Sequence, residues 1–115
     1  MTILHLAIES DWAAALAVGS YRVSTRGLTV DQVGFIHCST PAQVGRVAEL
    51  FYSEVPDPLC VLEMDPDTIR AAGTEVRFED VGNGELFPHI YGPIDPTWVL
   101  EAKPARMAEG RLVVD

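Results

Sequence analysis

The chain has 115 residues, of which 48% are hydrophobic, and its 17 acidic and 8 basic residues give a formal net charge of −9 at pH 7. A chain of this length and hydrophobic content buries a core without disulfides or metal ions, which excludes a disordered protein and predicts a single domain over residues 1–115. Its acidic surface repels phosphate backbones and anionic lipids, so nucleic acids and membranes are not expected partners.

The start of the chain and its cysteines predict a cytoplasmic protein. No apolar stretch has the length of a membrane span, and Met1 leads into a strand-like run without the basic residues of a signal peptide. Cys38 and Cys60 lie singly within hydrophobic runs, which is typical of reduced, buried thiols rather than of a disulfide.

Hydrophobic periodicity and end signals predict strands and helices in the first half of the chain. Ser10 is expected to cap a helix that ends at Gly19. Thr40 and Gln43 form a capping box for a second helix, with Pro41 at its first position. In chain order we predict a strand over residues 2–6, a helix over 11–18, a short strand over 21–24, a mobile connection over 26–32, a strand over 33–38 and a helix over 41–51.

The second half of the chain is richer in predicted strands. Gly82–Gly84 indicates a hairpin turn. Pro88 and Gly92 break the apolar run that follows, which predicts an edge strand or an extended loop there. In chain order we predict a strand over residues 59–64, a short helix or turn over 66–72, a strand over 75–79, the broken run over 87–91 and strands over 98–102 and 111–114. The whole pattern predicts an α+β fold with two main helices and a small mixed or mainly antiparallel sheet.

The three histidines indicate where a functional site lies. They occur in three short apolar runs, Ile3–Leu6, Phe35–Thr40 and Phe87–Gly92. A buried imidazole requires a hydrogen-bond partner, and imidazole exchanges a proton near neutral pH. Strand alternation places His37 on the same face as Phe35, and the chain continues through Ser39 into the capped helix. An imidazole, a hydroxyl and free N–H groups at a helix start suit a phosphate or a carboxylate.

The third run and its surroundings add further candidates. If the run is extended, Phe87, His89 and Tyr91 share one face, which suits stacking on a flat ligand and equally suits packing at a sheet edge. Glu85 is close enough to His89 in the sequence to be a candidate acid or base. For each histidine the structural alternative is a hydrogen-bonded core residue without a ligand.

Other chemical motifs are missing from the sequence. The glycines at 82 and 84 form a turn and not a phosphate-binding loop, and there is no Gly-x-Ser-x-Gly nucleophile motif. Three histidines form a zinc site only if the fold brings them together, and their spacing does not demand it.

In their order and spacing, these motifs resemble those of one protein family. They are the run Ile3–Leu6, the segment from Trp12 to Tyr21, the segment from Gly34 to Val44 and the run Phe87–Gly92. On these residues the chain resembles the domain-of-unknown-function family number 952 over nearly its whole length to about Gly92. That family is grouped with the ADP-ribosyltransferase-like superfamily, which includes RNA 2′-phosphotransferases.

The resemblance implies an ADP-ribosyltransferase-like pair of split sheets with a cleft lined by His5, His37, Ser39 and His89. In that superfamily a histidine on the opening strand holds the ribose of NAD, and His5 is similar in place. The phosphotransferases have a His-x-Ser pattern before a helix, to which His37 and Ser39 are similar. The chain departs from the superfamily at the third motif, where Glu85 is only the nearest carboxylate.

Three hypotheses about function follow. The first is a cleft that binds NAD, ADP-ribose or a related phosphorylated nucleotide, with or without a transferase activity. The second is a non-catalytic module that binds or senses a small molecule, and the third is a histidine-centred, metal-dependent hydrolase. For the first hypothesis the candidate catalytic residues are His37, His89 and Glu85, and the candidate ligand-binding residues are His5, Ser39, Thr40, Phe87 and Tyr91.

Overall fold

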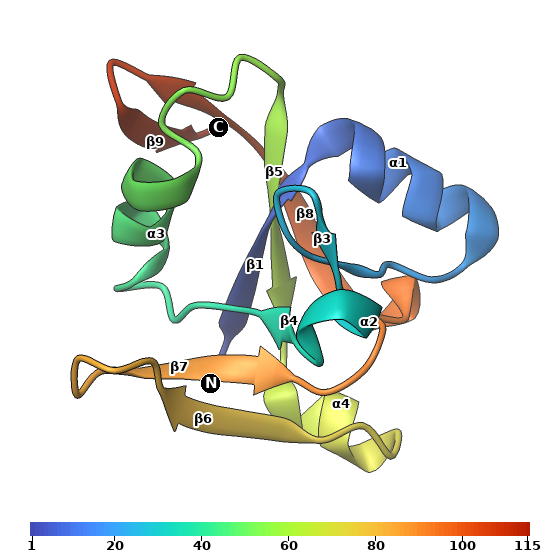
Figure 1. The fold of residues 1–115 in the computed structure, drawn as a ribbon. Coiled ribbons are helices and arrows are strands. Elements are labelled where there is room, and N and C mark those ends of the chain that lie inside the picture. The colour runs from blue at the N-terminus through green and yellow to red at the C-terminus, as the bar shows by residue number, and fades with distance from the viewer.

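Four antiparallel strands form the larger sheet in the computed structural model, which describes residues 1–115 (Figure 1). Their order across the sheet is β1 (Ile3–Ile8), β5 (Leu59–Met64), β8 (Val99–Ala108) and β9 (Arg111–Val114). β1 therefore occupies an edge of this sheet. Beyond that edge Leu4 forms an isolated bridge with Ser39, in which each residue donates its N–H to the carbonyl of the other over 2.7 Å.

Two smaller antiparallel sheets lie beside the larger one. One has the order β4 (Ile36–His37), β7 (Leu86–Ile90) and β6 (Val76–Asp80), and the other is the hairpin of β2 (Val23–Thr25) and β3 (Leu28–Thr29). The helices are α1 (Glu9–Val18), α2 (Val30–Val33), α3 (Val44–Phe51) and α4 (Pro66–Ala71), with one 3-10 turn over Pro96–Trp98. This arrangement confirms a mixed α+β fold with antiparallel sheets. No helix is both long and apolar enough to cross a membrane.

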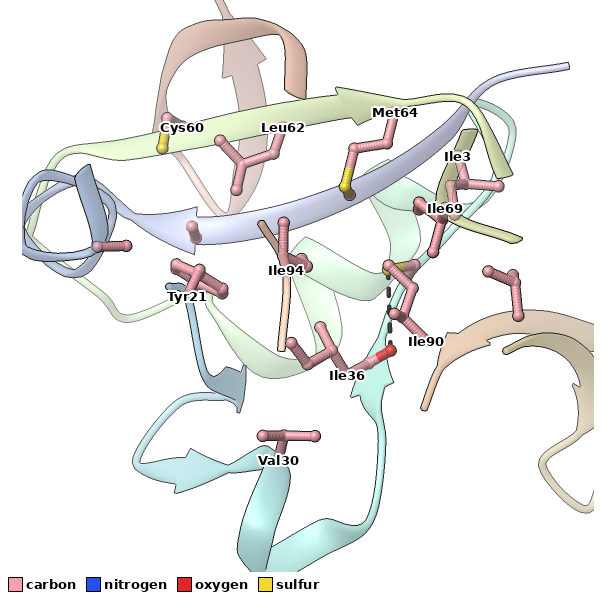
Figure 2. Close-up of a cluster of buried hydrophobic side chains, with 14 residues drawn as sticks. Ile3, Tyr21, Val30, Ile36, Cys60, Leu62, Met64, Ile69, Ile90 and Ile94 are labelled. Carbon is pink, nitrogen blue, oxygen red and sulfur yellow. Dashed lines mark hydrogen bonds between the residues drawn. The ribbon is translucent and has the colours of Figure 1, made fainter. Parts of the chain in front are cut away.

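Strands β1 and β5 of the larger sheet are buried on both faces because apolar residues follow one another along them. One face packs toward Ile36 and Ile90 of the three-stranded sheet, through Ile3, Ala7 and the even-numbered residues of β5. Figure 2 shows Cys60, Leu62 and Met64 of β5 in this cluster, on the same side as Tyr21 and Ile94. On the other face, Leu4, Leu6, Leu59 and Val61 pack against Val44 and Ala48 of α3. Burial of this apolar surface is the main stabilising contribution to the fold.

The buried cysteines are structural residues of this core. Both are free thiols, and burial raises the pKa of each, that of Cys60 to about 12. Cys38, one residue beyond β4, belongs to the core cluster, and its Sγ contacts the carbonyl oxygen of Ile36 at 3.8 Å, the dashed line in Figure 2. A thiol that stays protonated is a poor nucleophile, so neither cysteine is chemically activated.

Several predicted boundaries in the first half are wrong for local reasons. Helix α1 begins at Glu9 without a side-chain cap, so Ser10 lies inside it, whereas Gly19 ends it with φ +82° as predicted. The connection over residues 26–32 is not a mobile loop, because it forms β3 and most of α2. Since α2 continues to Val33 and ends at Gly34, the strand predicted over 33–38 is reduced to β4.

The second predicted helix starts three residues late. Thr40 donates its backbone N–H to Oε1 of Gln43 over 3.0 Å, which is one of the two bonds of the predicted capping box. The residues between them form a turn, and α3 begins only at Val44. The N–H groups of Thr40, Gln43 and Val44 are thus bonded within the chain, which leaves fewer free N–H groups at the helix start than predicted.

The run over residues 87–91 is a central strand and not the predicted edge strand. β7 pairs with β6 from Val76↔Ile90 to Asp80↔Leu86, and with β4 on its other side. Pro88 is tolerated because its missing N–H lies on the side of β4. The Pro88 carbonyl accepts from the N–H of Cys38 on that side, one residue beyond the end of β4. The predicted hairpin turn at Gly82–Gly84 joins β6 to β7 and is confirmed.

Candidate functional site

A cavity of about 810 Å³ opens beside the edge strand β1. Its wall is assembled from five parts of the chain: β1, the β2–β3 hairpin, the segment from Val33 to Ser39, the segment from Arg46 of α3 to Tyr52, and the β6–β7 turn with Phe87. The volume lies in the range of small-molecule and cofactor sites.

The charge of the cavity wall differs from that of the whole protein. No aspartate or glutamate lines it, although the chain has 17 acidic residues, and its two arginines are Arg26 and Arg46. Arg26 donates from Nη1 to the Phe51 carbonyl over 3.2 Å. Arg46 forms an ion pair with Glu85, which lies outside the lining. An acidic protein therefore has a cavity whose charged side chains are cationic, and such a cavity favours an anionic ligand.

His5 is part of the wall, but both of its ring nitrogens are engaged within the protein. Its side chain is 1% exposed. Nδ1 lies 2.7 Å from the His37 carbonyl oxygen and donates to it, and Nε2 accepts from the Tyr21 hydroxyl over 2.9 Å. Burial lowers the pKa of His5 to about 4, so the ring is neutral. His5 therefore joins β1 to β4 and has no nitrogen free for the ribose contact that the resemblance implies.

His37 lies on β4 with its ring against the cavity. Its backbone N–H donates to Ser24 Oγ over 3.3 Å, and its ring lies 5.3 Å from that of Phe87 and 5.5 Å from that of His89, centre to centre. Nε2 of His37 is buried and has no partner within the protein. Burial, reinforced by His89, lowers the pKa of His37 to about 4. The residue thus presents a neutral imidazole at the wall.

His89 lies behind His37 and outside the lining of the cavity. The ring is 3% exposed and stacks on Phe35 at 4.0 Å with an angle of 14° between the planes. Nδ1 lies 2.8 Å from Oε1 of Glu79, and the Tyr91 hydroxyl donates to the same oxygen. Nε2 of His89, like that of His37, is buried without a partner in the protein.

Five rings from β4, β7 and the residues next to these strands therefore form one continuous row. Ring contacts connect Tyr91 to Phe35, Phe35 to His89, His89 to His37, and His37 to Phe87. The row follows from strand alternation, which places the odd-numbered residues of both strands on the face away from the core. The predicted stripe of Phe87, His89 and Tyr91 is present, but it packs on Phe35 and His37, and only its Phe87 end reaches the cavity.

Two candidate site residues, Glu85 and Thr40, lie elsewhere. The Glu85 carboxylate pairs with Arg46 and accepts from Nε2 of Gln43 over 3.1 Å, so it does not reach His89. The carboxylate beside His89 is that of Glu79, diagonally across the β6–β7 pair. Thr40 does not line the cavity. Of the eight candidates, the structure places His5, His37, Ser39 and Phe87 on the cavity wall, with His89 and Tyr91 behind it.

Sequence reasoning missed four residues that shape the site: Tyr21, Glu79, Arg26 and Arg46. Glu79 could have been identified from the sequence, because the hairpin turn at Gly82–Gly84 sets Glu79 opposite Phe87, two residues along the strand from His89. Tyr21 and the two arginines carry no sequence signal, since only the tertiary packing of separate segments brings the arginines to the wall and Tyr21 to His5.

The histidines do not form a metal centre. Nowhere in the chain do three or more histidine, cysteine, aspartate or glutamate side chains come together as metal ligands. Both nitrogens of His5 are engaged with Tyr21 and the His37 carbonyl, which leaves two imidazoles with a free nitrogen. A structural or catalytic zinc site needs at least three protein ligands, so the donor set does not fit the metal-dependent hydrolase hypothesis.

Acidification is expected to destabilise the fold through its buried histidines. In the folded chain the pKa of His5 is about 4, against an ordinary value of 6.5 for the unfolded chain. Between these values the unfolded chain binds more protons, so stability is full above about pH 6.5 and is lost as the pH falls toward 4. From pH 7 to pH 5, His5 alone should lower the free energy of unfolding by about 2 kcal/mol. Urea unfolding at several pH values measures this, and a flat profile between pH 7 and pH 5 would contradict it.

Comparison with known proteins places the chain in a family. No curated protein matches it significantly. Among solved structures, it is similar to protein CC0527 from Caulobacter crescentus, with a TM-score of 0.82 and 24% identity over 98% of this chain and 94% of that one. It is equally similar to a double mutant of CC0527, with a TM-score of 0.83 and 23% identity over the same shares. At these identities the likeness shows a common fold. The profile of the family described as protein of unknown function (DUF952) matches residues 6–102, and the chain therefore belongs to that family.

Proposed function

We propose that the cavity binds an anionic, nucleotide-sized ligand of the ADP-ribose or NAD type. The observation that carries this proposal is the charge of the wall, which holds two arginines and no carboxylate in a protein of net charge −9. Such a contrast concentrates an anion in the cavity while the surface around it repels anions.

The other wall residues support a ligand with phosphate, sugar and ring components. Arg26 and Arg46 supply donors for phosphate oxygens. His37 and Ser39 supply polar contacts near the edge of β1, and Phe87 supplies a ring face for stacking. A volume of about 810 Å³ accommodates a ligand of this size. On this proposal the fold is of the ADP-ribosyltransferase type, as the sequence resemblance implies.

Binding without turnover is the form of this function that the wall favours. A transferase of this type uses a carboxylate close to the sugar, and no aspartate or glutamate lines this cavity. We therefore infer a module that binds or senses the ligand. Incubating the protein with NAD and following the release of nicotinamide tests this point, and sustained release would favour the transferase instead.

Calorimetric titration with ADP-ribose and NAD tests the binding proposal, with a charge placed at the cavity mouth as the probe. Leu50 on α3 is 67% exposed and lines the cavity, so Leu50→Glu adds a negative charge there without disturbing the core. We expect ADP-ribose to bind roughly threefold to tenfold more weakly to this variant, through charge repulsion.

Leu16→Glu is the matched control, because Leu16 is a helical leucine that is 57% exposed and does not line the cavity. It changes the net charge equally and should leave the affinity unchanged. If the unaltered protein binds neither ligand, or if both variants weaken binding equally, the proposal is wrong.

A further inference from the structure

A series of three side chains, Glu79, His89 and His37, connects the outer side of the three-stranded sheet with the cavity wall. Glu79 on β6 is partly exposed and contacts Nδ1 of His89 at 2.8 Å. The buried His89 ring neighbours the His37 ring at 5.5 Å, and His37 lines the cavity. One end of the series is thus a carboxylate at the surface, and the other is an imidazole at the proposed ligand site.

The carboxylate determines which nitrogen of His89 carries the proton. Glu79 Oε1 accepts from two groups, the Tyr91 hydroxyl and the His89 ring, and these bonds hold the pKa of Glu79 below its ordinary value. An ionised carboxylate only accepts, so Nδ1 of His89 must be the protonated nitrogen. In the neutral ring, Nε2 of His89 is then an acceptor that needs a donor.

The adjacent His37 ring has a nitrogen that can act as this donor. Nε2 of His37 and Nε2 of His89 are the two buried side-chain polar atoms without a partner in the protein, and they belong to adjacent rings. Buried polar groups are almost always hydrogen-bonded. A proton on Nε2 of His37 satisfies both atoms, either by direct contact after a small ring rotation or through one bridging water. This assignment leaves Nδ1 of His37 unprotonated.

We propose that Glu79 is a positioning residue that acts through the His89 ring to fix His37 as a neutral hydrogen-bond acceptor for a hydroxyl group of the bound ligand. The identity of the ligand rests on the proposed function. The effect of Glu79 on the two histidines does not depend on that function. Arg26 and Arg46 bind the phosphates of the ligand, and His37 accepts a hydrogen bond from a sugar hydroxyl. The low pKa of His37 agrees with a neutral ring at pH 7.

Imidazole 15N NMR of the ligand-free protein tests the series directly. We expect His89 to carry its proton on Nδ1 and His37 on Nε2, each with one protonated and one unprotonated nitrogen signal. Glu79→Leu removes the acceptor, and both rings should then show averaged signals of mixed tautomers. In Glu85→Leu, the matched control, both rings should keep the pattern of the unaltered protein, because the Glu85 carboxylate bonds to Arg46 and Gln43 and not to either histidine. A proton on Nε2 of His89, or a His37 pattern that Glu79→Leu does not change, would overturn the proposal.

A binding measurement tests the hydroxyl contact separately. Glu79→Leu should weaken ADP-ribose binding about tenfold, the value of one well-made hydrogen bond, and leave the affinity for inorganic pyrophosphate unchanged. Pyrophosphate has no sugar hydroxyl and depends on the arginines alone. Equal losses for both compounds would overturn the contact with His37. If the unaltered protein binds no ADP-ribose, the proposed function is wrong. The NMR result still shows whether Glu79 determines the protonated nitrogens of His89 and His37.

Discussion

Replacing His5 with alanine is expected to lower the free energy of unfolding by about 3–5 kcal/mol, although His5 lines the cavity. The variant loses a fully buried ring and leaves two polar groups without partners, the Tyr21 hydroxyl and the His37 carbonyl. Tyr21 is 1% exposed, so water does not replace the lost bond. Guanidinium unfolding followed by fluorescence measures the change.

Tyr21→Phe separates the hydrogen bond from the packing. This variant alone should cost about 1–3 kcal/mol, because it leaves Nε2 of His5 buried and without a partner. The double variant should cost less than the sum of the two single variants, since it no longer contains an unpaired hydroxyl. Strict additivity, or a cost of His5→Ala below about 1 kcal/mol, would show that His5 does not hold the two sheets together.

The two partners of the Arg46–Glu85 ion pair are expected to affect ADP-ribose binding in opposite directions. Arg46→Ala should weaken binding about tenfold to a hundredfold, because it removes a charged donor from the cavity wall. Glu85→Gln should strengthen binding, because the carboxylate no longer competes with the ligand for Arg46. Calorimetric titrations of both variants against the unaltered protein measure the two shifts.

Arg106→Ala is the matched control for this prediction. Arg106 has the exposure of Arg46, 56% against 57%, and also pairs with a carboxylate, that of Asp115, but it does not line the cavity. Its loss should leave the affinity unchanged. If Arg106→Ala weakens binding as much as Arg46→Ala, the effect comes from net charge, and Arg46 does not contact the ligand.

Residue patterns predicted the fold where short-range rules govern it. The strand predicted over 59–64 matches β5. The side-chain alternation along β1 and β4 is also as expected, because successive residues of a strand point to opposite faces. Pro88 misled the prediction because a proline signals an edge in isolation, whereas here the neighbouring strand ends one residue short of it. The start of α3 was misplaced because one turn satisfied the same end signal without continuing as a helix.

The candidate site was predicted only in part because it depends on which distant segments meet. The histidine runs predicted which segments form the wall. The face shared by Phe35 and His37 predicted which side of their segment lies toward the cavity. The partners of His5 and His89 could not be identified from spacing in the same way. Tyr21 belongs to a segment that is not paired with β1, and Glu79 reaches His89 diagonally across a hairpin. These contacts decide which imidazoles remain available to a ligand.

The bridge between Leu4 and Ser39 has a consequence for the behaviour of the protein in solution. An outermost strand that displays free amides and carbonyls recruits a strand of another molecule and thereby promotes aggregation. Ser39 uses both of its backbone groups to occupy that position on β1, on the same side as the cavity. The residue that shapes the wall therefore also blocks the Leu4 position of this edge strand, and loss of the bridge frees one amide and one carbonyl for pairing with another molecule.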